Sequence, residues 1–471
     1  MVNLTKTERI WKKLVTLLRD GFNSYPVYIM EALLAAVFVA THNEVAGAVV
    51  FVALISFLLV ICDDVLPTTL PFLLMSAFLT NCYDSFNTFI RYIWAAPFVI
   101  MCLVYHFIRY RKPLKIGKSA HGILAVSVAI SLGGIGNYSP LDYMRGAYYI
   151  FGLGFGMLGV YYLLQSQFFA KRDYDLNERF AVIMTIMGLF SAFVVGSGYF
   201  HKYVLDYKGS AYLLGFSRNN IATMMMFAMP FPLYLGRKKW WMTAFTPVIY
   251  AAICVTTSRG GLIFGSIEFA VCCAYWILLE EDKGIRKRRL LECLISFGVV
   301  LLVFGKIIID VILNRIVADD VITGDVRFDM MIDSFEKFGE RPMHGFGILD
   351  NDMIYAGYKK KGAMSWYHMM IPQIIASMGL MGVAAYGFQI FGRCKLIFTK
   401  KCAWSLCLGI SYLGVLLMSQ VNPGEFCPVP FEMLAVLLFI LQERRFHTFE
   451  DLPLNGVLRE KINREKRKIL L

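Results

Sequence analysis

Long apolar runs recur along the chain, and they constrain its fold more than any other feature of the sequence. A run of about 20 apolar residues is the length that crosses the hydrocarbon core of a bilayer as a helix. The chain is 58% hydrophobic and only 17% charged, whereas soluble globular proteins carry more charge. The sequence therefore predicts an all-α polytopic membrane protein with about 12–14 transmembrane helices.

The distribution of Lys and Arg predicts how the chain is oriented. When the N-terminus is placed inside and the runs alternate, most of the basic residues fall on the inner side. This bias favours an N-in, C-in topology, and it accounts for the net charge of +13 without a nucleic-acid partner. The inner segments expected after the N-terminal arm are 109–118, 170–179, 236–239, 280–289, 392–401 and the C-terminal tail, and 419–428 is expected as an outer loop.

Five regions follow from this topology. Residues 1–25 form a cytoplasmic amphipathic arm, which lacks the apolar segment of a cleavable signal sequence. Residues 26–311 hold the N-terminal and central transmembrane helices, and 312–366 form an extracytoplasmic lid loop with a short helix in RFDMMIDSFEKF. Residues 367–443 hold the C-terminal transmembrane helices, and 444–471 form a basic cytoplasmic tail. The scattered cysteines have no metal-ligand spacing and are expected to be packing residues.

Four side chains stand out on the predicted outer face, which is otherwise poor in cations. Arg218 precedes one apolar run, and Arg259 lies in the tight turn between two others. Arg327 lies in the lid loop, and His368 opens a long apolar run. A plain interpretation is that the arginines reach lipid headgroups or solvent and that the histidine is an interfacial residue.

A functional interpretation is that these side chains converge. Guanidinium groups match phosphate oxygens and keep their charge, and histidine, with an ordinary pKa of about 6.5, can take a proton from a hydroxyl. A pyrophosphate leaving group needs its developing charge stabilised. The sequence contains no HExxH motif, Gly-rich phosphate loop or Cys/His cluster, so it predicts neither a metal nor a cofactor.

Short motifs in the C-terminal half carry a resemblance to a known family. His368 is followed by ten residues and then by Gly379-Leu-Met-Gly382, and Pro342-Met-His-Gly345-Phe-Gly347 follows Arg327. With Ser258-Arg259-Gly260, these residues resemble the O-antigen ligase and O-antigen polymerase family of multi-spanning glycosyltransferases, which includes protein O-oligosaccharyltransferases. The segment Ser217–Ala222, which contains Arg218, resembles the start of a family span. Met369 stands where the family usually has Asn, Ser or Gln.

The resemblance implies a GT-C-like fold and a specific reaction in the cytoplasmic (inner) membrane of a bacterium. The donor would be an oligosaccharide on undecaprenyl pyrophosphate, and the acceptor a glycan, lipid or protein hydroxyl at the outer face. His368 would activate the acceptor, and Arg259 and Arg327 would bind the pyrophosphate. Either a polymerase or a ligase of O-antigen, capsule or exopolysaccharide biosynthesis fits this pattern.

Three further residues are expected near the substrate. His344 competes with His368 as the base, although a Gly-rich turn would hold it less rigidly. Lys360 belongs to a basic run that could meet donor phosphate, headgroups or solvent. Glu268 lies inside an apolar run, where a carboxylate is usually paired, so we expect an ion pair with one of the arginines.

A transporter offers an alternative function. A lipid-linked oligosaccharide flippase would also need many spans, but transporters tend to have inverted repeats and helices broken within the membrane. The sequence shows no such repeat, and its informative charges are expected at one face. A purely structural scaffold would leave the outer arginines and histidine without a role.

Overall fold

The computed structural model describes residues 6–81, 96–110, 112, 117–135, 149–169, 172, 174–203, 217–311, 326–348, 367, 369–399 and 401–446. Within these ranges the regular structure is helical and contains no strand. The chain divides into two compact units, each made of two separate stretches. Unit 1 comprises Met1–Leu114 and Ser166–Thr256, and unit 2 comprises Lys115–Gln165 and Thr257–Leu471.

Unit 1 contains the helices of the N-terminal quarter and those of the central stretch. Helix α10 packs against α2, α11, α12 and α13, and α3 packs against α4 and α6. The elements are α1 (Lys6–Phe22), α2 (Tyr25–Ala40), α3 (Glu44–Ile61), η1 (Leu66–Thr68), α4 (Thr69–Asn81), α6 (Ala96–Arg109), α10 (Leu176–Tyr203), α11 (Arg218–Ala228), α12 (Phe231–Gly236), η5 (Trp240–Ala244) and α13 (Phe245–Val255).

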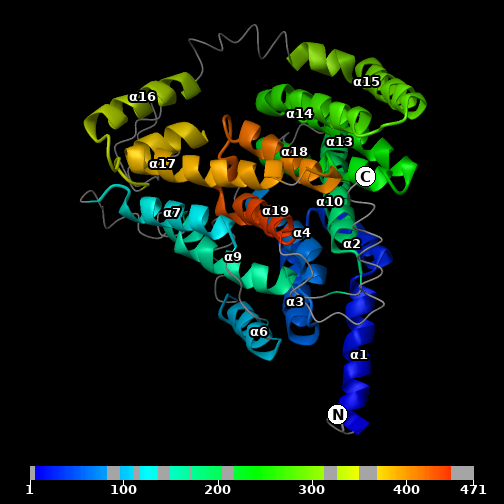
Figure 1. The fold of residues 1–471 in the computed structure, drawn as a ribbon. Coiled ribbons are helices and arrows are strands. Elements are labelled where there is room, and N and C mark those ends of the chain that lie inside the picture. The colour runs from blue at the N-terminus through cyan, green and yellow to red at the C-terminus, as the bar shows by residue number, and fades with distance from the viewer. Residues whose placement is uncertain are drawn as a thin grey trace. The chain divides into compact units, whose positions relative to one another are not determined.

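Unit 2 is built around one long helix, α17 (Met370–Thr399), which packs against α7 and α16 (Figure 1). Helix α14 packs against α15 and α18. The other elements are α7 (Ser119–Leu132), most of α9 (Phe155–Phe168), α14 (Arg259–Leu278), α15 (Lys283–Val311), α16 (Val326–Glu340), α18 (Ala403–Met418), η7 (Gly424–Phe426), η8 (Pro428–Glu432) and α19 (Met433–Glu443).

Several of these helices have the length and composition of membrane spans. Among the described residues, four qualify: Glu44–Ile61, Leu176–Phe200, Arg259–Leu278 and Met370–Thr399. A fifth is formed if Leu14–Phe22 and Tyr25–Ala40, which meet at a bend of 61°, make one broken span. Large apolar side chains on the outside, such as Leu302 at 88% exposed and Ile108 at 73%, suit contact with lipid.

The helices occupy the apolar runs, and the short helix expected in the lid loop is α16. One predicted loop is wrong. Residues 392–399 continue α17, and Arg393 among them is buried rather than part of an inner loop. Glu425, expected in an outer loop, is also buried. The two side chains form an ion pair with each other, and this pairing makes burial of both charges tolerable.

In unit 1, connecting segments that the sequence predicts on the inner side contact one another. Asp64, between α3 and η1, accepts hydrogen bonds from Arg172 Nη2 at 2.7 Å and Nε at 3.0 Å. Tyr174 also donates to Asp64, and the Leu66 amide donates at 3.0 Å. Lys112 Nζ donates to the Asp63 carbonyl at 2.6 Å. These bonds hold the ends of α3, α6 and α10 together.

The environment of Asp64 favours its charged form. Burial alone would raise the pKa of this carboxyl, but the Arg172 guanidinium and the hydrogen bonds from Tyr174 and Leu66 hold the pKa well below its usual range. Because the folded-state pKa is lower than the unfolded one, the pair stabilises the fold above the unfolded pKa of about 3.9. This contribution is lost as the pH falls through the folded-state value.

Asp64→Asn should destabilise unit 1, because it leaves the buried Arg172 guanidinium without its counter-charge. We expect a loss of about 3–5 kcal/mol, the usual effect of breaking a buried pair. Thermal denaturation in detergent at neutral pH measures it, and the difference from wild type should shrink in strong acid. Asp63→Asn is the matched control, since that side chain is 46% exposed and 3.8 Å from Arg19. Equal midpoints for the two variants would contradict the assignment.

Candidate functional site at the starts of α14, α16 and α17

Helix α17 is interrupted at Gly379, and this interruption organises the site. Gly379 has φ 57° and ψ −147°, a conformation open essentially to glycine alone. A Cβ there would lie 2.4 Å from the Pro342 carbonyl oxygen. A break in a helix frees backbone donors and acceptors, which need new partners when they are buried.

The turn 342–347 supplies those partners. The amides of Leu380 and Met381 donate to the carbonyls of Pro342 and Met343 at 2.7 and 3.2 Å. In return, the amides of Phe346 and Gly347 donate to the carbonyls of Ala376 and Ser377 at 2.8 and 2.9 Å. The two glycine motifs that carry the family resemblance are therefore parts of one hydrogen-bonded joint.

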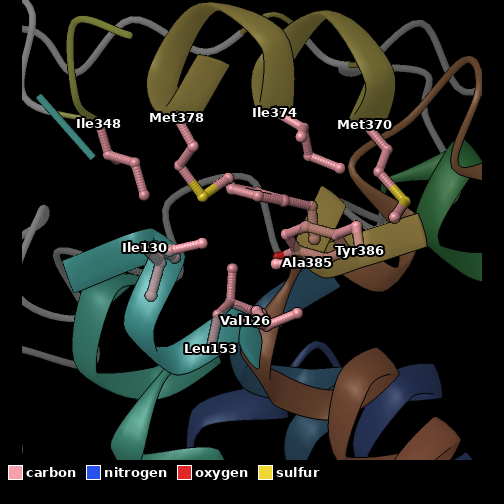
Figure 2. Packing of buried hydrophobic residues seen from close by; sticks show 11 residues of the cluster. Val126, Ile130, Leu153, Ile348, Met370, Ile374, Met378, Ala385 and Tyr386 are labelled. Carbon is pink, nitrogen blue, oxygen red and sulfur yellow. The ribbon is translucent and has the colours of Figure 1, made fainter. Parts of the chain in front are cut away.

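An apolar core lies beneath this joint. Figure 2 shows Met370, Ile374 and Met378 of α17 pointing toward Val126 and Ile130 of α7. Ile348, just after the turn, packs into the same cluster and is 3% exposed. The first part of α17 and the residue after the turn therefore pack into the same core.

His344 has a backbone role in the joint. Its carbonyl accepts a hydrogen bond from the Gly134 amide at 2.8 Å, which ties the end of α7 to the turn. Its side chain is half-buried. The contacts that fix this residue are therefore made by its main chain.

The start of α17 is anchored on two sides. The Met370 amide donates to the Ser419 carbonyl at 2.8 Å, and the Tyr367 hydroxyl donates to Asp333 Oδ2 of α16 at 2.6 Å. Met369 is 8% exposed and packs with Met330 of α16. Its apolar side chain thus fills a contact between two helices. His368 itself lies outside the described residues.

The start of α14 meets the same region. Ser258 caps the helix, because its hydroxyl accepts the Gly261 amide at 3.1 Å, and Arg259 is the first helical residue. A Cβ on Gly260 would lie 2.3 Å from Val421 Cγ2, so this glycine permits close contact with the segment after α18. The same segment holds the start of α17 through Ser419.

Arg327 is the second residue of α16, one turn before Met330. Through Met330, Tyr367 and Met369 the first half of α16 packs against the residues on both sides of position 368. The starts of α16 and α17 are therefore in direct contact, and the segment after α18 links the start of α17 to that of α14. Helix N-termini carry partial positive charge, so this end of unit 2 favours an anion.

The other predicted site residues have different positions. Arg218 begins α11 in unit 1, whereas Arg259, Arg327 and His344 belong to unit 2. Lys360 lies outside the described residues. Among the residues that the structure describes, no three His, Cys, Asp or Glu side chains are grouped so that they could hold a metal ion.

The predicted ion pair of Glu268 with an arginine is wrong for the described part of the chain. Glu268 is fully buried, and neither carboxylate oxygen has a hydrogen-bond partner among the described residues. The carboxyl group lies against Gly414 of α18, where a Cβ would be 2.3 Å from Oε2. Glu268 is nine residues after Arg259 on the same helix, a rise of about 13 Å, so its own helix cannot bring the two together.

One group of charged residues was missed from the sequence. Arg393 of α17 pairs with Glu425 and, at 2.8 Å, with Glu432, and all three are buried. The available signal was the presence of two carboxylates in apolar segments near the C-terminus, since such groups need partners. Placing Arg393 in a loop concealed the pairing.

Comparison of the chain with protein families, with curated proteins and with solved structures finds no match. The resemblance to the glycosyltransferase family therefore rests on the sequence motifs alone and stays a prediction.

Gly379→Ala should disrupt the joint, because alanine is strained at this φ and ψ and its Cβ would contact Pro342. We expect a loss of stability of at least about 1–3 kcal/mol from the backbone strain. Gly387→Ala on the same helix is the control, since a Cβ there meets nothing within 4 Å. It should be neutral or slightly stabilising. Thermal denaturation in detergent compares them, and an unchanged midpoint for Gly379→Ala would refute the role of the joint.

Proposed function

We propose that the chain transfers a glycan from an undecaprenyl-pyrophosphate donor to an acceptor hydroxyl at the outer face of a bacterial cytoplasmic membrane. The protein would be a GT-C-like, N-in and C-in enzyme with about 12–14 spans. The supporting observation is that the starts of α16 and α17 contact each other and that one short segment contacts the starts of both α17 and α14. These starts carry Arg327, the residues flanking His368, and Arg259. Arginines and helix N-termini together suit a pyrophosphate.

The proposed reaction is a direct displacement. His368 takes the proton from the acceptor hydroxyl, whose oxygen attacks the anomeric carbon of the donor sugar. The bond between that carbon and the phosphate oxygen breaks, and the pyrophosphate leaves with the electron pair. Arg259 and Arg327 stabilise its charge, and the anomeric configuration inverts.

A flippase for lipid-linked oligosaccharides is the second candidate. The interruption of α17 and the buried charges around Arg393 are features also found in transporters. Reconstituted vesicles with a lipid-linked donor separate the two functions. A new glycosidic bond supports the transferase, as a ladder for a polymerase or a single transfer for a ligase. Movement of the donor between leaflets without bond formation supports the flippase.

His368→Ala should lower the transfer rate by about 10²–10⁴-fold, the usual contribution of a general base. The assay is product formation by purified protein, with thermal denaturation to confirm folding. His344→Ala is the matched control, because the backbone bond from Gly134 survives the substitution. The reverse result, with His344→Ala inactive and His368→Ala active, would reassign the base.

Arg259→Ala should lower the rate by about 10²–10³-fold, as expected when a group that stabilises leaving-group charge is removed. Arg259→Lys should recover little of it, because an ammonium group lacks the paired donors of the guanidinium. Arg288→Ala on α15 is the control, since that side chain is 69% exposed. Full recovery by lysine would show that a single positive charge is sufficient.

A further inference from the structure

The proposed reaction makes no use of the buried charges in unit 2. Arg393 is 2% exposed and lies between Glu425 of η7 and Glu432 of η8. The Tyr412 hydroxyl of α18 donates to Glu425 Oε2 at 3.0 Å and accepts from Arg393 Nη1 at 3.2 Å. Burial of three ionisable groups is costly, so their retention in an apolar interior points to a specific role.

Glu425 connects this cluster to the segment 419–426, which we name the connecting segment. Its backbone amide donates to Ser419 Oγ at 2.9 Å, and Ser419 is fully buried. The Asn422 amide ties the segment to the end of α18 by donating to the Met418 carbonyl at 3.0 Å. Within the segment, the Phe426 amide donates to the Pro423 carbonyl at 2.8 Å. The Arg393–Glu425 pair thus fixes the far end of a short, folded segment.

The near end of the connecting segment contacts two of the helix starts that form the candidate site. The Ser419 carbonyl accepts the Met370 amide of α17 at 2.8 Å. Val421 packs against Gly260, next to Arg259 at the start of α14. A displacement of the segment would therefore disturb both helix starts at once.

We infer that Glu425, held by Arg393, is a positioning residue that keeps the starts of α14 and α17 together through the connecting segment. The catalytic consequence of this inference rests on the proposed function, but the structural role of Glu425 does not. Glu432 provides an internal comparison. It binds the same guanidinium and is also buried, yet its side chain bonds to Arg393 and Gln389 among the described residues. Its amide donates to the Cys427 carbonyl at 3.0 Å, whereas the Glu425 amide donates to Ser419.

Hydrogen–deuterium exchange of the full chain in detergent, read by mass spectrometry over 369–373, tests the structural part. In Glu425→Gln the Met370 amide should exchange about 10-fold faster or more, the effect of losing a hydrogen bond to a charged group. Glu432→Gln, which also removes one carboxylate from Arg393, should exchange like wild type. Unchanged exchange in Glu425→Gln, or equal acceleration in both variants, would overturn the inference.

If Glu425→Gln fails to fold, Ser419→Ala replaces it. That variant removes the acceptor of the Glu425 amide and leaves every charge in place. It should accelerate exchange at Met370 in the same way, and exchange at the wild-type rate would overturn the inference.

Transfer assays on the same variants test the catalytic consequence. Glu425→Gln should lower kcat about 10-fold and raise KM for the lipid-linked donor by a smaller factor, because a displaced start of α14 leaves Arg259 charged but misaligned for the transition state. Glu432→Gln should keep the wild-type kcat. An active wild type with unchanged kcat in Glu425→Gln would overturn the positioning role in catalysis. An inactive wild type together with faster exchange in Glu425→Gln would refute the proposed function alone.

Discussion

The pairing of backbone groups around Gly379 is the constraint on which the rest of unit 2 depends. A helix interrupted in an apolar surrounding leaves amides and carbonyls that water cannot satisfy. The turn 342–347 supplies two carbonyls and two amides to the break, and in return its own groups are satisfied. Because the turn directly follows α16, closing the break also fixes where α16 lies against α17. The placement of the start of α16 against α17 at the candidate site follows from this joint.

Buried ion pairs perform a related task in each unit. Asp64 and Arg172 join connecting segments of unit 1, and Arg393 with Glu425 and Glu432 joins α17 to the segments after α18 in unit 2. Such pairs contribute less to net stability than their Coulomb attraction suggests, since both charges lose hydration. They do specify partners, because an unpaired charge at either place would be strongly unfavourable. Apolar packing alone would not specify so closely which segments lie next to each other.

The same contacts give a physical reason for the glycine positions in the two sequence motifs. The spacing of Gly379 and Gly382 looks arbitrary in the sequence, as does the turn Pro342–Gly347. In the structure, Gly379 permits the break, and a Cβ on Gly382 would lie 2.5 Å from Met378 Cβ. Met369, which departs from the family pattern, packs against α16. The glycine positions are thus explained by close backbone approach, whatever substrate the site binds.

Composition and hydropathy were sufficient to predict a helical chain, and helices occupy the apolar runs where the structure describes them. Four or five of the described helices are long and apolar enough to span a membrane. Arg327 was expected to begin the short helix of the lid loop and is the second residue of α16, whereas Arg259, expected in a turn, is the first residue of α14. The partners of Glu268, Arg393 and Glu425 could not be predicted, since they depend on which helices become neighbours. Glu268 was expected beside an arginine and instead lies against Gly414.

The sequence by itself therefore determined where the helices form, because hydrophobic length and turn residues act over a few residues. Only the tertiary structure decided that the Gly379 break is closed by the turn 342–347, and that the connecting segment holds the starts of α14 and α17. Both depend on backbone groups that every residue possesses. Which amide pairs with which carbonyl is decided by the packing of segments that are distant in the sequence. The residue types alone do not indicate these partners.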